Sequence, residues 1–343
     1  MPRRYLLFLS WNIAATIILL ALLEFVLREL LHHPPARPHA LLHALRDYYG
    51  HTKRIVQYLP QCARYDQELG YTLRPGRCRF SNYEYKTTLA IDSVGIRDTE
   101  ASLTTPEIIV SGDSFAMGWG VARDDIYSEI IRRKSGKRVL NTAVSSYGTV
   151  REMGILKRVD LSHTEWLVHE YCSNDVEENA KYLNDPNFST MTSEQYMSYV
   201  VLNARETRYY PGKYLRELFP IIARHTWSDT DDLPPLAVRK ETAPTDARAF
   251  IDVLRRASHL PKNVRMLVFA VEPYNRNDGL FIRALENELR AGNVPANVAE
   301  VRTLDVTPLL NESMYFRLDD HLNAKGHAAI AEAICNIIRC NDH

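Results

Sequence analysis

The sequence predicts an α/β fold with a central parallel sheet, preceded by one N-terminal transmembrane helix. Two patterns support this prediction: apolar β-branched runs alternate with helical periodicity, and 19 consecutive uncharged residues lie near the N-terminus. The 343 residues are 45% hydrophobic and 24% charged, a composition typical of packed globular chains and not of disordered ones. Lys plus Arg and Asp plus Glu both number 42, and this balance argues against a nucleic-acid partner.

The predicted sheet takes its strands from short apolar runs between amphipathic segments. Because strands alternate with helices, the pattern favours a parallel sheet with helices on both faces and a ligand site beyond the carboxyl ends of the strands. The strands are expected at Ile108–Ser111, Val139–Asn141, Trp166–Tyr171, Met266–Val271 and Val301–Val306. The helices between and after them are expected at 124–134, 149–160, 246–258, 280–291 and 324–338.

The uncharged stretch lies between Arg4 and Glu24 and is long enough to cross a bilayer as a helix. Arg3 and Arg4 precede it, which predicts a cytoplasmic N-terminus and places the remainder of the chain in the periplasm or outside the cell. A cleaved signal peptide and a buried core helix are the alternatives. The run ends in Leu22-Leu23-Glu24-Phe25 without a small-residue cleavage site, and this favours a retained anchor in the cytoplasmic membrane.

Three segments follow from this pattern. Residues 1–30 are predicted as a cytoplasmic stub and signal anchor, residues 31–64 as a proline-containing spacer with a juxtamembrane helix, and residues 65–343 as the main domain. A Tyr-rich insert at about 178–245 interrupts the alternation and is interpreted either as a lid or specificity region or as simple packing.

The five cysteines suit an oxidising compartment. Cys62 and Cys78 lie in one loop-like stretch, and Cys335 and Cys340 close the last predicted helix, so these two pairs are plausible disulfides. Cys172 remains, and its apolar strand context indicates a small core residue rather than a reactive thiol.

A candidate nucleophile follows the first strand of the alternation. Ser114 stands in Ser111-Gly112-Asp113-Ser114, after a buried strand and before a predicted helix, where its hydroxyl can face a cleft. A helix cap or a turn is the alternative role for this Asp-Ser pair.

A candidate base precedes the last helix. His321 titrates in the range that suits removal of a proton from a serine hydroxyl, and a carboxylate is needed to orient it. Asp319 lies two residues before His321, so both side chains leave the same face of an extended segment. A structural histidine and an acidic helix cap are the alternatives.

Donors for an oxyanion are expected in the loops after the next two strands. Asn174 follows the strand Trp166–Tyr171, and Ser145-Ser146-Tyr147-Gly148 lies after the strand Val139–Asn141. An asparagine in such a loop is also a common turn residue.

Together these motifs resemble the SGNH (GDSL-like) hydrolase superfamily over roughly residues 105–340. The motifs are GDS at 112–114, a small-residue loop after the next strand, Asn-Asp at 174–175 and Asp-x-His at 319–321. Segments 70–76 (GYTLRPG) and 92–98 (DSVGIRD) resemble the leader of membrane-anchored bacterial members.

The resemblance implies a flavodoxin-like α/β/α domain and assigns a role to each candidate residue. Ser114 would be the nucleophile, His321 the general base and acid, and Asp319 the residue that orients His321. The oxyanion hole would comprise the N–H groups of Ser114 and Ser146 and the side chain of Asn174.

Two departures from the family pattern affect this assignment. Ser146 stands where the family usually has glycine, with Gly148 two residues later. The family's more familiar carboxylate, three residues before the histidine, would fall on Leu318, whereas Asp319 resembles the variant of bacterial polysaccharide O-acetylation proteins. Asp320 would point the other way in an extended segment. Asp113, Gly148 and Asp320 are candidate supporting residues.

These residues predict ester chemistry through an acyl-enzyme, with no metal and no organic cofactor. The expected function is a membrane-anchored serine esterase acting on acyl esters, above all acetyl esters, of a cell-envelope carbohydrate. The Tyr-rich insert would offer sugars a stacking surface. The alternatives are a polysaccharide O-acetyltransferase, a lipid esterase or thioesterase, and a non-catalytic glycan-binding component of an envelope assembly.

Overall fold

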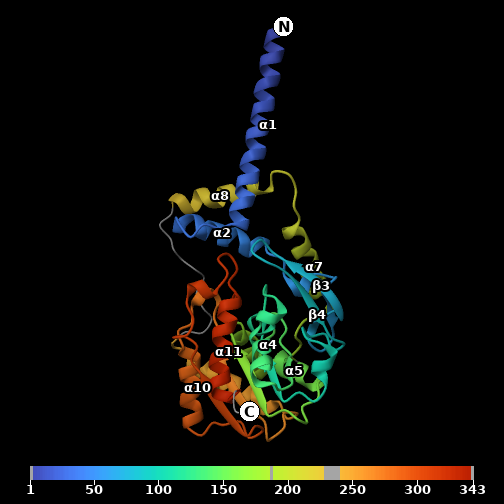
Figure 1. The fold of residues 1–343 in the computed structure, drawn as a ribbon, viewed down its shortest axis with the longest axis vertical. Helices are drawn as coiled ribbons and strands as arrows, with labels where there is room; N and C mark the ends of the chain where they lie inside the picture. The colour runs from blue at the N-terminus through green and yellow to red at the C-terminus, as the bar shows by residue number, and fades with distance from the viewer. Residues whose placement is uncertain (1–2, 186–187, 228–239, 341–343) are drawn as a thin grey trace.

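The computed structural model describes residues 3–185, 188–227 and 240–340. Helix α1 (Arg3–His32) projects from one end of the molecule, and α2 (His39–Thr52) lies across its base beside α8 (Lys213–Trp227) (Figure 1). The body below them contains the predicted parallel sheet. Parts of the predicted insert, residues 186–187 and 228–239, lie outside the described residues, as do residues 1–2 of the predicted stub.

The main sheet has five parallel strands in the order β6-β5-β7-β8-β9. When these five strands are numbered in chain order, their order across the sheet is 2-1-3-4-5, as in flavodoxin-like sheets. The predicted parallel α/β sheet is therefore confirmed. The strands are β5 (Ile108–Ser111), β6 (Val139–Asn141), β7 (Trp166–Tyr171), β8 (Arg265–Ala270) and β9 (Glu300–Leu304).

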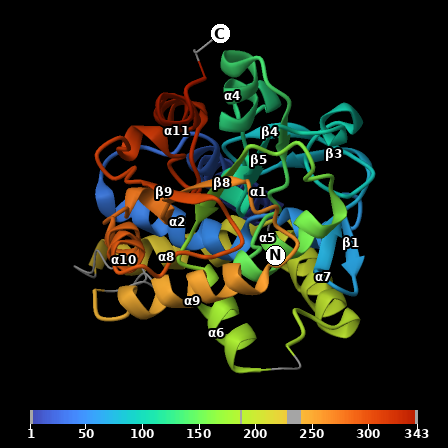
Figure 2. The same cartoon turned by 90° about the horizontal axis from the view of Figure 1, so that it is seen from below.

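Alternate residues of these strands enter two separate hydrophobic cores. In β5, Ile108 and Val110 belong to one core, and Ile109 between them belongs to the other. A strand turns successive side chains to opposite faces, so a continuous apolar run indicates a sheet covered on both sides. In Figure 2, α4 and α11 lie on one side of the sheet, and α9 and α10 lie on the other.

Five of the helices packed on the sheet lie close to the predicted positions, and one, α6 (Asp175–Asn184), was not predicted. These helices are α4 (Tyr127–Ser135) and α11 (Ala324–Ile338) on one face, and α5 (Thr149–Ile155), α6, α9 (Ala243–Arg256) and α10 (Leu280–Arg290) on the other. The strand order reverses between β5 and β7, and ligands of such sheets bind outside the carboxyl ends of the strands at this switch point.

The N-terminal segments form more than a spacer. Two antiparallel hairpins, β1 (Ala63–Asp66) with β2 (Gly70–Leu73) and β3 (Gly76–Ser81) with β4 (Lys86–Ile91), precede the main sheet. A third hydrophobic core joins α1, α2 and α8 through buried side chains that include Leu31, Tyr48 and Leu218. Helix α7 (Ser193–Thr207) packs beside the first hairpin. The insert therefore packs against the N-terminal segments, and its buried Tyr196 and Tyr214 serve that packing.

Helix α1 exposes apolar side chains along much of its length, among them Phe8, Trp11, Ile17 and Leu22, each more than half exposed. Over the part of the chain that the structure describes, no helix meets the combined length and hydropathy required of a membrane span. The predicted transmembrane helix is therefore not confirmed.

Both cysteine pairs suggested by the sequence are joined in the structure, Cys62 to Cys78 and Cys335 to Cys340. The first bridge links the start of the β1 hairpin to β3, and the second closes the end of α11. Cys172 is free and buried at the end of β7, in agreement with its prediction as a core residue.

Candidate active site

Ser114 begins the short helix α3 (Ser114–Met117) directly after β5. The Asp113 carboxylate caps this helix by accepting the Phe115 N–H at 2.9 Å, which satisfies a donor that has no partner in the first helical turn. Gly112 makes the turn with φ +150, and a Cβ there would lie 2.6 Å from the Glu170 Oε2 atom. Glycine is therefore required at position 112 for the strand to turn into the helix over Glu170.

His321 lies between Ser114 and Asp319. The Ser114 Oγ is 2.7 Å from His321 Nε2, and His321 Nδ1 is 2.5 Å from Asp319 Oδ1. The imidazole ring stacks on Trp119 at a centroid distance of 4.8 Å and an angle of 15°. Packing and hydrogen bonding thus hold one ring orientation, with a carboxylate on one nitrogen and a hydroxyl on the other.

The Asp319 carboxylate is completely buried and accepts further hydrogen bonds on its Oδ2 atom. The donors are the Tyr49 hydroxyl, the Tyr85 hydroxyl at 3.0 Å and the Trp119 Nε1 at 2.9 Å. A buried carboxylate stays ionised only if such donors replace its hydration. These donors favour a charged Asp319 beside the imidazole.

The backbone that carries Asp319 is held by a second carboxylate. Glu84 accepts the N–H groups of Arg317, Leu318 and Asp319 at 2.7, 2.8 and 2.9 Å. Phe316 N–H also donates to the His321 carbonyl, which closes a tight turn around the two candidate residues. Residue 84 is more than 230 positions away in sequence, so the geometry of the turn is a tertiary property.

Asp320 does not point away from His321, contrary to the prediction. Its Oδ1 lies 3.0 Å from His321 Nδ1, because residues 317–321 form a bend rather than an extended strand. Lys53, which follows α2, places its ammonium 3.0 Å from the same Asp320 oxygen. Two carboxylates therefore face one imidazole, and a lysine from the N-terminal segment compensates the second.

These charges control protonation at the site. Burial alone would lower the pKa of His321, but the carboxylates of Asp320 and Asp319 outweigh burial and raise this pKa to about 9. Burial alone would raise the pKa of Asp320, but Lys53 and His321 outweigh it and hold that pKa well below the ordinary value. The pKa of Asp319 is lowered in the same way by His321 and Lys53.

Asp319, Asp320 and His321 also bring three possible metal-ligand atoms within 4.8 Å of one another. The fit to a cation is poor, because Lys53 already places a positive charge on Asp320, and three donors contact Asp319 Oδ2. The donor set suits an imidazolium better than a metal ion.

The predicted oxyanion residues are less organised than the serine, the histidine and the aspartate. Asn174 is exposed just after β7, and its side-chain amide donates to Asp113 Oδ2 at 3.0 Å. Ser146 is exposed with φ +57, and its hydroxyl accepts from Gln57 at 3.0 Å. A positive φ explains why glycine suits this position.

The N–H groups of Ser114 and Ser146 donate no hydrogen bond to other described residues. The N–H of Gly148, by contrast, donates to Glu178 at 3.3 Å, so Gly148 serves the start of α5 and not the candidate site.

Ionisable side chains that the sequence analysis did not select lie buried beneath Ser114. Glu170 of β7 accepts the Asp113 N–H at 3.1 Å. Burial and the charge of Asp113 raise the pKa of Glu170 well above its ordinary value. Glu152 and His169, also fully buried, approach to 3.4 Å. The carboxyl group of Glu170 therefore supports the turn below the serine.

The sequence analysis also missed Tyr49, Lys53, Glu84 and Tyr85. All four act on the turn at 316–321 from positions more than 230 residues earlier. No short motif marks them. Trp119, which also contacts Asp319 and His321, lies only five residues after Ser114 in the sequence.

A scan against protein-family models gives no match to this chain, and a search of curated proteins gives none either. Solved structures give distant likenesses. A protein described as a GDSL-like lipase from Bacteroides ovatus ATCC 8483 matches with a TM-score of 0.36 at 14% identity. The match covers 68% of this chain and 54% of that protein, so this chain spans about half of its length.

Two further structures are similar to a comparable degree. A protein described as lipolytic and of the G-D-S-L family, from Desulfitobacterium hafniense DCB-2, matches with a TM-score of 0.36 at 11% identity, over 67% of this chain and 98% of its own. An acetyl xylan esterase from the rumen bacterium Butyrivibrio proteoclasticus matches with a TM-score of 0.34 at 12% identity, over 68% and 64%. At such low scores and identities, these likenesses carry no argument about activity.

Proposed function

We propose that this chain is a serine esterase of the SGNH type, with Ser114 as nucleophile, His321 as general base and acid, and Asp319 as the residue that orients His321. The observation that carries this proposal is the continuous hydrogen-bond chain from Ser114 Oγ through both nitrogens of His321 to Asp319. A hydroxyl, a base and an orienting group in this order form the arrangement that activates a serine. The non-catalytic alternative would instead leave His321 turned away from Ser114.

The reaction would proceed through an acyl-enzyme. Ser114 Oγ attacks the ester carbonyl while His321 Nε2 takes its proton, and Asp319 stabilises the resulting imidazolium. The N–H groups of Ser114 and Ser146, with the Asn174 amide, would stabilise the oxyanion. The ester C–O bond breaks, His321 returns the proton to the leaving alkoxide, and water activated by His321 then releases the acid from Ser114.

The candidate nucleophile and base are largely shielded from solvent. Ser114 is 6% exposed and His321 is 7% exposed. Tyr199, from the predicted insert, is exposed and is available to stack on a sugar ring. We propose acetyl esters of a cell-envelope carbohydrate as the substrate class.

The first experiment treats the full chain in neutral detergent with a fluorophosphonate probe and weighs the intact protein. We expect one adduct on the wild-type protein and none on Ser114→Ala. Folding of both proteins is checked by circular dichroism. A folded wild-type protein that takes no adduct contradicts the esterase proposal and favours a binding role.

A second experiment identifies the ester. Acetylated oligosaccharides and fatty-acyl esters are compared as substrates, and free acetate is measured with and without an acceptor sugar. The proposal predicts acetate release from the acetylated sugar. Transfer of acetyl to the acceptor would instead indicate an O-acetyltransferase, and preference for fatty-acyl esters a lipid esterase.

We also propose that α1 holds the chain at the cytoplasmic membrane, with the N-terminus inside and the catalytic domain in the periplasm or outside the cell. The support is the row of exposed apolar side chains on α1 and the two disulfide bonds of the domain. Membrane fractions washed with alkaline carbonate should retain the full chain, and external protease should reach the domain in spheroplasts. Recovery in the carbonate supernatant would contradict an integral anchor.

A further inference from the structure

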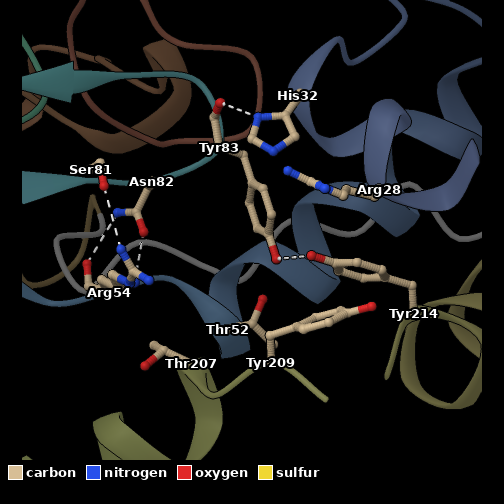
Figure 3. Close-up of a pocket in the computed structure, with 10 residues that line it drawn as sticks. All are labelled: Arg28, His32, Thr52, Arg54, Ser81, Asn82, Tyr83, Thr207, Tyr209 and Tyr214. Carbon is tan, nitrogen blue, oxygen red and sulfur yellow. Dashed lines mark hydrogen bonds between the residues drawn. The ribbon is translucent and has the colours of Figure 1, made fainter. Parts of the chain in front are cut away.

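A cavity of about 420 Å³ lies on the α1 side of the β3–β4 hairpin, apart from the candidate active site. Figure 3 shows its lining, which comes from the ends of α1 and α2, the tip of the hairpin and the connection between α7 and α8. Ser114, His321 and Asp319 do not line it. Its volume falls within the range of roughly 300–1,000 Å³ typical of small-molecule sites.

Two arginines bring positive charge to this cavity, while Glu24, one turn before Arg28 on α1, accepts hydrogen bonds from the Tyr209 hydroxyl at 3.5 Å and the Tyr214 N–H at 3.3 Å beside it. Arg28 of α1 and Arg54, just after α2, both line it, and neither forms an ion pair with an acidic side chain among the described residues. Among the described residues, the Arg54 guanidinium donates to the Ser81 hydroxyl, and the Arg54 backbone bonds to the neutral side chain of Asn82. The guanidinium groups therefore retain donors for an anionic ligand.

Neutral hydrogen-bonding groups complete the lining. The Tyr83 and Tyr214 hydroxyls meet at 3.5 Å in the centre of the cavity, between the two arginines (Figure 3). His32 hydrogen-bonds to the Tyr83 carbonyl at 3.0 Å, and its ring packs edge-on against Tyr83 at 5.3 Å. These contacts fix the wall before any ligand binds, which lowers the entropic cost of binding.

Acidic side chains are absent from the described lining, whereas two arginines, a histidine and several hydroxyls are present. Arginine forks match the oxygens of a phosphate group, and tyrosine hydroxyls add single donors. A neutral sugar would leave the Arg54 guanidinium, which donates only to Ser81 among the described residues, without a counter-charge. We propose that this cavity binds the phosphate group of a phosphate ester.

The surroundings indicate where such an ester could come from. Phe25 lies about one turn before Arg28 on α1 and is 56% exposed, and Ile18, two turns further, is 59% exposed. The apolar part of a phospholipid could lie along these side chains while its headgroup enters the cavity. A water-soluble phosphate ester would use the same arginines without the apolar contact.

The cavity also adjoins the candidate active site through one short segment. Thr52 and Arg54 line the cavity, while Lys53 between them contacts Asp320 beside His321. The site nevertheless binds phosphate by its own groups, and the proposal does not depend on ester hydrolysis.

The test uses the full chain in neutral detergent and the double variant Arg28→Gln/Arg54→Gln. Binding of glycerol 3-phosphate is measured by titration calorimetry, and binding to vesicles by flotation with phosphatidylglycerol in phosphatidylcholine or with phosphatidylcholine alone. We expect the double variant to bind the phosphate probe at least about tenfold more weakly, because both charged donors are lost.

Arg77→Gln is the matched control, since this exposed arginine lies at the opposite end of β3 and does not line the cavity. Arg77→Gln should bind as the wild type does. Tyr83→Phe, which keeps the ring and removes only the hydroxyl, should weaken binding by a smaller factor of about two to five. Thermal unfolding checks that each variant is folded.

Loss of glycerol 3-phosphate binding in the double variant supports a site for the phosphate ester itself. Loss confined to phosphatidylglycerol vesicles supports the same site with a lipid as its source. The proposal is overturned if the double variant binds the probes as tightly as the wild type, or if Arg77→Gln loses as much binding affinity as the double variant. It is also overturned if neither probe binds to the wild type, or if neutral maltose binds in place of phosphate. Fluorophosphonate labelling of Ser114 is recorded in parallel and reports separately on the ester site.

Discussion

The two halves of the candidate active site are held in different ways. In the base half, Asp319 and His321 are fixed by Tyr49, Tyr85, Trp119 and Glu84 at hydrogen-bond distance. In the oxyanion half, Asn174 and Ser146 are exposed; the Asn174 amide donates to Asp113, and Ser146 accepts from Gln57 and Arg151.

This difference indicates which part of the site is ready before substrate binds. The base half already has a buried carboxylate with every required donor, and its geometry is preorganised. In the oxyanion half, the Asn174 amide must leave Asp113 or share its donors to reach a substrate oxygen. The predictions below test this contrast.

The largest effect is expected from Asp319→Asn. An uncharged amide neither fixes the tautomer in which His321 Nδ1 carries the proton nor stabilises the imidazolium, so kcat for a model acetyl ester should fall by about 10³–10⁴-fold. The measurement is steady-state hydrolysis, with Asp320→Asn as the matched control in the adjacent residue. Equal losses in the two variants would contradict the assignment of Asp319 as the orienting carboxylate.

Asn174→Ala should have the next largest effect, of about 10²–10³-fold on kcat, because one oxyanion donor is lost. KM should change little, since the donor acts mainly in the transition state. Unchanged kcat in a folded Asn174→Ala protein would show that this amide only caps Asp113 and takes no part in catalysis.

Tyr49→Phe should lower kcat by about tenfold, because Asp319 loses one donor and its charge is less well compensated. Tyr48→Phe is the matched control, since the preceding tyrosine of α2 makes no hydrogen bond with Asp319. Both variants are compared by kinetics and by thermal unfolding. Similar kinetics in Tyr49→Phe and the wild type would show that the Tyr49 hydroxyl of α2 does not contribute to the base half.

The smallest effect at the optimum, and the most specific one, is expected from Asp320→Asn. The base must be neutral, so kcat/KM for the wild type should rise with pH as His321 loses its proton near its pKa of about 9. Asp320 is a main cause of that raised pKa, so Asp320→Asn should move this rise to lower pH. A rise at unchanged pH would contradict the proximity of Asp320 to the ring.

The same pKa shift has a consequence for stability. The pKa of His321 is raised in the folded protein from its ordinary value of 6.5. The protonated ring therefore stabilises the fold, and this stabilisation is fully present below about pH 6.5. This contribution is lost as pH rises through about 9. Urea unfolding of the wild type and His321→Gln should therefore differ more at pH 6 than at pH 10.

Much of the fold could be predicted because its signals are local. Each strand of the main sheet is a short apolar run, and the five predicted strands lie within a few residues of β5 to β9. Ser114, Asn174 and His321 were found from their places at the ends of such strands or before the last helix. A single sequence can therefore predict the place of a site residue when that place depends on the neighbouring strand or helix.

The orientation of Asp320 could not be predicted from local sequence. Adjacent residues such as Asp320 and His321 take opposite faces only in an extended segment, and Glu84 holds residues 317–319 in a bend. The roles of Tyr49 and Lys53 could not be predicted either, because both depend on tertiary contacts. No local sequence pattern links these residues to a turn some 270 residues later.

The sequence by itself determined the alternation of strands and helices, the serine at the first strand end and the histidine and aspartate before the last helix. It determined these because hydrophobic periodicity and motif spacing act over a few residues. Only the tertiary structure decided which carboxylate meets which nitrogen, and which N-terminal side chains hold them. Those contacts join residues far apart in the chain, and they exist only after α2 and the hairpins have packed against the final turn.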